Sequence, residues 1–139
     1  MAQHIPRLVA LGLLLALALC ALARGRAQTT DRPAVNPAGE YQLASVDGKS
    51  LPCTIDHGGT PMIIQSGRFT ITTTNHQCLS VMTVSVGDRK DIRIETRATY
   101  TLDGSDLTMK WQNAGTTRGR VAGQTFTMTN EGRAFVFKK

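Results

Sequence analysis

The sequence predicts an all-β fold, in which an antiparallel up-and-down meander of eight or nine strands closes into a small barrel. Apolar and polar residues alternate with a period of two along much of the chain after residue 39, and short turn sequences rich in Gly, Asp and Asn separate the alternating stretches. Thr, whose β-branched side chain suits a pleated surface, occurs 18 times, always after position 28. Closure avoids exposed strand edges, and a two-sheet β-sandwich is the alternative.

The clearest strand is expected over residues 92–102, where apolar residues alternate with charged residues and Thr. Asp103-Gly104-Ser105-Asp106 forms a turn into the next expected strand, over residues 107–112. The same pattern predicts the remaining strands at 41–46, 51–55, 62–65, 68–74, 78–86, 120–129 and 133–138. Hairpins in sequence order predict a meander and not the long crossovers of a Greek key.

Residues 1–27 are expected to be a cleaved signal peptide. Arg7 precedes an uncharged Leu- and Ala-rich run over residues 8–23, which is shorter than the ~20 residues that span a bilayer core. Small-x-small cleavage sites end at Ala23 and Ala27, and the second is preferred. A lipoprotein signal at Cys20 and an uncleaved anchor are the alternatives. The protein is therefore expected to be exported, periplasmic or extracellular, with no stable membrane span after cleavage.

The remaining chain divides into a flexible leader over residues 28–38, which has no apolar periodicity, and a single domain over 39–139. Cleavage removes Arg7, Arg24 and Arg26, so that 13 basic and 10 acidic side chains remain and the net charge falls from +6 to +3. The basic residues are interspersed with acidic ones, whereas nucleic-acid binding needs a concentrated basic face. Nucleic acid is therefore not expected as a partner.

Several motifs between residues 39 and 139 carry a family resemblance. They are Gly39-Glu40-Tyr41-Gln42-Leu43, Ser45-Val46-Asp47-Gly48-Lys49-Ser50-Leu51-Pro52, Ser66-Gly67-Arg68-Phe69-Thr70, the hairpin from Tyr100-Thr101-Leu102 to Leu107-Thr108-Met109, and Phe135-Val136-Phe137-Lys138. Together they resemble the small secreted lipocalin-like (calycin-type) proteins of bacteria, and Gly39-x-Tyr41 is similar to the Gly-x-Trp that opens lipocalins. The resemblance implies a barrel in which Arg133 or Lys138 lies across that aromatic ring, and it implies no particular ligand.

The two cysteines that remain after cleavage, Cys53 and Cys78, predict a disulfide in an oxidising compartment. On the chain-entropy argument such a bridge would contribute about 3 kcal/mol to stability. Two free thiols are one alternative. Another is a tetrahedral metal site made of Cys53, His57, His76 and Cys78, although neither half has the tight Cys-x2-Cys spacing. No cofactor is expected.

A small apolar molecule bound inside the barrel is the first functional hypothesis, because an eight-stranded barrel is wide enough either to be filled by side chains or to hold one small ligand. The residues expected to face the interior, and to line such a site, are Tyr41, Leu43, Ile71, Ile94, Tyr100, Met109, Trp111, Phe126, Met128 and Phe137.

An extracytoplasmic interaction module or hydrolase inhibitor is the second hypothesis, since polar, Gly-rich loops at 56–60 and 113–119 can display binding residues on a rigid scaffold. Arg118-Gly119-Arg120 with Lys110 and Arg97 would offer an acidic envelope protein a modest basic patch. No catalytic motif occurs, so an enzyme is not expected. The chain is expected to be a monomer.

Overall fold

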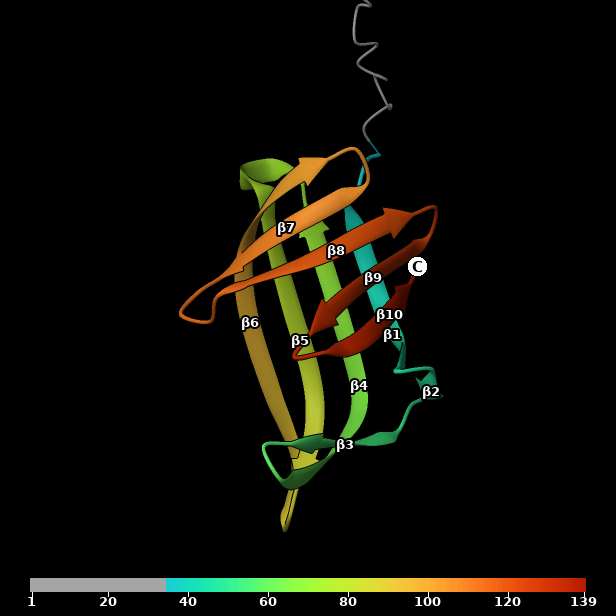
Figure 1. The fold of residues 1–139 in the computed structure, drawn as a ribbon, viewed down its shortest axis with the longest axis vertical. Coiled ribbons are helices and arrows are strands. Elements are labelled where there is room, and N and C mark those ends of the chain that lie inside the picture. Colours follow the sequence, from blue (N-terminus) through green and yellow to red (C-terminus); the bar gives the residue numbers. More distant parts are fainter. Residues whose placement is uncertain (1–34) are drawn as a thin grey trace, which may run out of the picture. The chain divides into compact units, whose positions relative to one another are not determined.

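A computed structural model describes residues 35–139 of the chain. The predicted signal peptide and residues 28–34 of the predicted leader lie outside the described residues. The strands are β1 (Gly39–Val46), β2 (Lys49–Ser50), β3 (Cys53–His57), β4 (Thr60–Thr72), β5 (Gln77–Val86), β6 (Arg89–Asp103), β7 (Asp106–Trp111), β8 (Thr116–Ala122), β9 (Thr125–Asn130) and β10 (Arg133–Lys138), with a 3-10 turn, η1 (Thr74–His76), between β4 and β5 (Figure 1).

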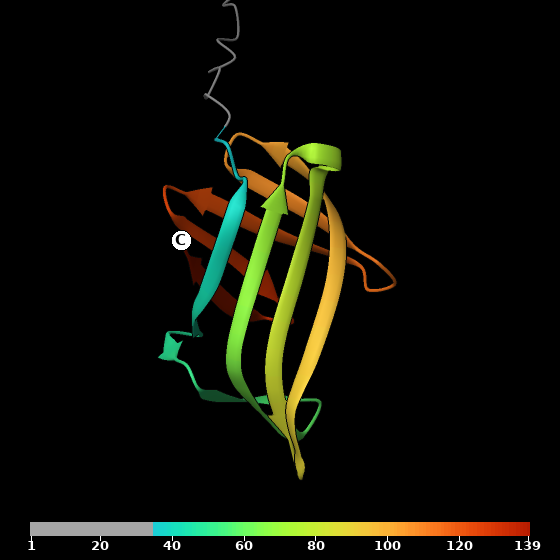
Figure 2. The same ribbon diagram turned by 180° about the vertical axis from the view of Figure 1, so that it is seen from behind.

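The strands form an antiparallel meander that closes into a barrel, as the alternation predicts. Each of β4 to β10 pairs with its neighbour in sequence, and β1 closes the circle because it pairs with β10 on one side and with β4 on the other. Eight strands therefore make the barrel, and β2 and β3 are additional. The long strands β4, β5 and β6 form one wall, which β7 to β10 cross (Figures 1 and 2).

Two predicted boundaries are wrong. Residues 62–65 and 68–72, predicted to belong to two strands, lie in one strand, β4, whose register with β5 shifts between Ile64 and Ser66, and the predicted residues 73 and 74 lie beyond its end. The predicted turn at Ser66-Gly67 is thus continuous strand directly after a bulge at Gln65, and a Cβ at Gly67 would lie 2.9 Å from the Leu43 side chain. Conversely, 120–129, predicted as one strand, is divided between β8 and β9 by a tight turn in which Gly123 has a φ of +60°.

One end of the barrel is covered by residues 35–38, which the sequence assigned to the leader. The Tyr41 hydroxyl donates a hydrogen bond to the carbonyl oxygen of Pro37 (2.8 Å), and the Val35 amide donates to that of Gly104 (3.3 Å). Pro37 is buried, and Val35 packs against the core. These four residues are therefore part of the folded domain.

The basic residue that lies across Tyr41 is Lys139, where the lipocalin resemblance implied Arg133 or Lys138. The Lys139 ammonium is 4.7 Å from the centre of the Tyr41 ring and donates a hydrogen bond to the carbonyl oxygen of Ala38 (2.7 Å). Arg133 is instead paired with Asp47 (3.4 Å). Lys138 is exposed, because Phe137 beside it points inward and successive side chains of a strand alternate.

The other end of the long wall extends beyond the closed barrel. β7 pairs with β6 only from Ala98 to Asp103, so residues 89–97 of β6 have a strand neighbour on one side alone. β3, which pairs only with β4, forms the other edge of this extension. No helix within residues 35–139 has the length and apolar character needed to cross a membrane.

Replacement of Gly119 by Ala should destabilise the barrel, because the added Cβ would lie 2.6 Å from the Phe126 ring and 2.9 Å from the carbonyl oxygen of Thr127. We expect the free energy of unfolding to fall by about 1–3 kcal/mol in a denaturant titration. The neighbouring exposed change Arg118→Ala should alter it by less than about 0.5 kcal/mol. Equal stability of G119A and the parent protein would contradict this packing.

Candidate functional site

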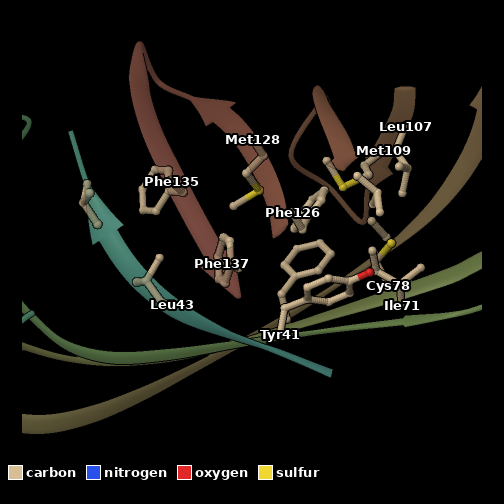
Figure 3. Packing of buried hydrophobic residues seen from close by; sticks show 14 of the residues in the cluster. Tyr41, Leu43, Ile71, Cys78, Leu107, Met109, Phe126, Met128, Phe135 and Phe137 are labelled. Atoms are coloured by element: carbon tan, nitrogen blue, oxygen red, sulfur yellow. The ribbon is translucent and has the colours of Figure 1, made fainter. Parts of the chain in front are cut away.

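The predicted interior residues form the hydrophobic core of the barrel. Eight of the ten are buried, namely Tyr41, Leu43, Ile71, Tyr100, Met109, Phe126, Met128 and Phe137. Side chains of β1, β9 and β10 converge in the centre (Figure 3). Trp111 is partly buried at the edge of this cluster, where its indole N–H donates a hydrogen bond to the Thr117 hydroxyl (2.8 Å).

Aromatic rings occupy the middle of the barrel. Phe69, which the prediction omitted, has its ring centre 4.6 Å from that of Phe126 and 5.5 Å from that of Phe137, and the edge of Trp111 meets it at 6.1 Å. Tyr41 is 5.9 Å from Phe126. These spacings are those of rings in direct contact. The side chains predicted to line a ligand site therefore pack against one another.

Ile94 is the exception among the predicted interior residues. Ile94 lies on the same face of β6 as Ala98 and Tyr100, as predicted, but 39% of its surface is exposed. The reason is topological, because β7 pairs with β6 only from Ala98 onward and leaves this part of β6 without a strand on that side. The prediction that Ile94 lies in the barrel interior is thus wrong.

The predicted disulfide between Cys53 and Cys78 is not formed, and both are free thiols. Cys53 lies opposite Ile64 and Cys78 opposite Ile71, both on β4. Seven residues of strand separate those positions by about 23 Å, whereas a disulfide needs Cα atoms within about 7 Å. Each cysteine fills a position in the core, where burial raises the pKa of the Cys53 thiol and raises that of Cys78 to about 12.

The alternative metal site is not assembled either. Cys53 and His57 belong to β3, while His76 and Cys78 lie at the far end of β4 and β5, so no metal-binding group forms among residues 35–139. Nδ1 of His57 is 3.3 Å from the Glu131 carboxylate. The His76 and Tyr100 rings lie in an edge-type contact, with 5.4 Å between their centres and 65° between their planes.

A groove of about 670 Å³ lies on the outer wall of the barrel, near the end that residues 35–38 cover. Two rows of side chains cross the strands there. One row is Thr70, Leu79 and Arg97, and the other is Thr72, Gln77, Thr99 and Lys110, each residue opposite the next in the strand register. The groove also contacts Cys78, Ala98, Trp111, Gln112 and Asn113.

The central side chains of the barrel take no part in this groove, which faces outward. Its hydrogen-bonding groups are hydroxyls, amides and two cations. Arg97 is paired with Glu95 (3.1 Å), whereas Lys110 has no carboxylate partner among the described residues. Sequence reasoning missed the groove because its residues come from four strands and only the cross-strand register places them in rows. The one available signal was the run Lys110-Trp111-Gln112-Asn113, polar at three of four positions as a strand ends.

The predicted basic patch is divided by its ion pairs. Arg120 is engaged by Asp106 through two hydrogen bonds, of 2.7 and 3.2 Å, and Arg97 by Glu95. Arg118 lies opposite Thr108, and Lys110 opposite Thr99 and Thr116, all on exposed positions of the same face. Lys110 and Arg118 are therefore the cations of this face that remain uncompensated within the described residues.

Comparison of the chain with known protein families, with curated proteins and with solved structures found no match.

The two thiols should react in a fixed order in the folded protein. At pH 8 a thiol with a pKa near 12 is almost wholly protonated, and the thiolate is the reactive form. N-ethylmaleimide should therefore label Cys53 before Cys78, and both completely once the protein is unfolded without a reductant, as measured by mass spectrometry of the peptides. Recovery of a Cys53–Cys78 cross-linked peptide would contradict the structure.

Proposed function

We propose that the protein is a non-enzymatic, exported binding protein that holds an acidic segment of an extracytoplasmic partner protein against the outer wall of its barrel. The observation that carries the proposal is the outer groove, where a row of hydroxyl and amide groups from Thr72, Gln77 and Thr99 ends at the ammonium of Lys110, which no carboxylate of residues 35–139 compensates. Such a row offers hydrogen bonds along an extended chain and a cation for a carboxylate at its end.

The rigid barrel supports this use. The groove crosses β4, β5, β6 and β7, whose backbone hydrogen bonds hold the two rows in register, so little conformational entropy would be lost on binding. Arg97 and its partner Glu95 border the groove on one side, and Arg118 extends the positive field on the other. Electrostatic complementarity of this kind favours an acidic partner and repels a basic one.

A small apolar ligand inside the barrel is the less favoured function, because the ligand would have to displace rings such as Phe69 and Phe126 that contact each other at 4.6 Å. The lipocalin-like character of the chain remains part of the proposal. It is supported by the closed eight-stranded barrel and by the position of Lys139 over Tyr41. Export, to the periplasm or beyond the cell, and the absence of catalysis also stay predictions.

Charge reversal at Lys110 tests the proposal. A fluorescent polyglutamate peptide should bind the protein at low salt, and Lys110→Glu should weaken its binding at least about five-fold, which corresponds to about 1 kcal/mol for one exposed ion pair. Fluorescence anisotropy measures both affinities. Lys49→Glu makes the same change of charge on β2, outside the groove, and should leave the affinity nearly unchanged.

Equal weakening by both reversals would show attraction to net charge alone and would contradict the proposed groove. Failure of the parent protein to bind the peptide would contradict the acidic partner. Saturable quenching of Trp111 by a fatty acid, with no effect of Lys110→Glu, would favour the interior site instead.

A further inference from the structure

The edge of β6 below the closed barrel is an open strand with backbone groups ready to pair. Its last contact with the β7 side is the hydrogen bond from the Gln112 amide to the carbonyl oxygen of Arg97 (3.0 Å). The backbone of Arg97 therefore points away from β5, and alternation directs Glu95 and Arg93 to the same side. Within residues 35–139 no strand pairs with this side of residues 92–96.

The side chains along this edge are of two kinds. Facing the inner side are Ile92, Ile94 and Thr96, and Ile94 is one of two large hydrophobic residues that the described part of the chain leaves exposed. Facing the outer side is the charged series Arg93, Glu95 and Arg97, which alternates in sign, whereas Asp91 before it lies at a bulge and has a φ of +53°. Glu95 already bonds Arg93 (3.2 Å) and Arg97 (3.1 Å), and these bonds lower the pKa of its carboxyl.

We propose that two copies of this chain associate edge to edge through β6, antiparallel about a two-fold axis at Ile94. In this register Arg93 lies opposite Glu95 of the partner subunit, and pairing extends over the open residues 92–96, since the backbone of Arg97 is already bonded to Gln112. The two Ile94 side chains meet on the inner side, where each covers the exposed surface of the other. The two sheets then form one continuous sheet across the two-fold axis. In each Arg93–Glu95 pair, the two residues exchange backbone hydrogen bonds.

The charges specify this register against its neighbours. A slide of two residues in one direction would place Glu95 opposite Glu95 of the partner subunit. A slide in the other direction would place the two Arg93 residues opposite each other. Both slides keep the apolar face on the same side but set like charges against each other, which is destabilising.

A second copy of the chain fits this edge because the charges along the edge are complementary to those of the same edge in antiparallel orientation. An unrelated strand would need the reverse charge order, which the chain itself supplies when it is turned end for end. Charged residues on an edge strand also serve to prevent association. Under that alternative the chain stays monomeric, as the sequence analysis expected.

Sedimentation velocity of the purified protein at low salt tests the proposal. The parent protein should sediment as a dimer at about 100 µM, a hundred times a micromolar Kd, and the association should weaken as salt is added. Glu95→Arg sets arginines against each other across the axis, and Arg93→Glu sets carboxylates against each other. Each should weaken association at least about ten-fold, by the loss of two cross-strand ion pairs and their replacement with repulsion.

The charge-swapped double variant R93E/E95R restores opposite signs across the axis and should dimerise again. An equimolar mixture of E95R and R93E should form a mixed dimer, since each supplies the charge that the other lacks. Arg118→Glu, on the face of β8 and away from this edge, should leave the dimer unchanged. Circular dichroism checks that every variant is folded.

A parent protein that remains monomeric at about 100 µM would overturn the proposal. So would a dimer that persists in both single variants, because association would then use another surface. Loss of the dimer without restoration in R93E/E95R would overturn the register.

Discussion

The packing of Phe69 against Phe126 and Phe137 in the middle of the barrel is the interaction on which the remaining structure depends. The three side chains come from β4, β9 and β10, and all are fully buried. They join the long wall to the strands that cross it. Glycines beside the cluster show how closely it is packed, since a Cβ at Gly119 would meet Phe126 and a Cβ at Gly67 would meet Leu43. Backbone pairing closes the barrel, and these contacts fill it.

A filled interior directs binding to the outside of the molecule. The outer wall offers two features that no other part of the described chain covers, a polar groove ending at Lys110 and an unpaired edge along β6. The two are separate along the strand, because the groove involves Arg97 and Thr99 whereas the edge centres on Ile94. Closure of the barrel by β1 pairs the edges of β4 and β10, while β3 forms the second edge of the extension. The long wall continues past this closure, and its exposed end is where association is proposed.

Alternation along the strands predicted the barrel and most of its core, because the period of two assigns each side chain to a face. It did not predict the exposure of Ile94, since a face becomes buried only where another strand covers it. The disulfide was inferred from cysteine number and compartment, and the register that sets Cys53 and Cys78 apart along β4 is not visible in the sequence. The groove was missed for the same reason, because Thr72, Gln77 and Lys110 become neighbours only through pairing.

The most direct test of a filled barrel is the stability of Phe69→Ala in a denaturant titration. If the ring is enclosed by its aromatic neighbours, its removal should lower the free energy of unfolding by about 3–5 kcal/mol, while Thr70→Ala on the outer face should have a small effect. If the interior were a hollow ligand site, the ring would already border open space. A loss below about 1 kcal/mol for Phe69→Ala would therefore contradict this account.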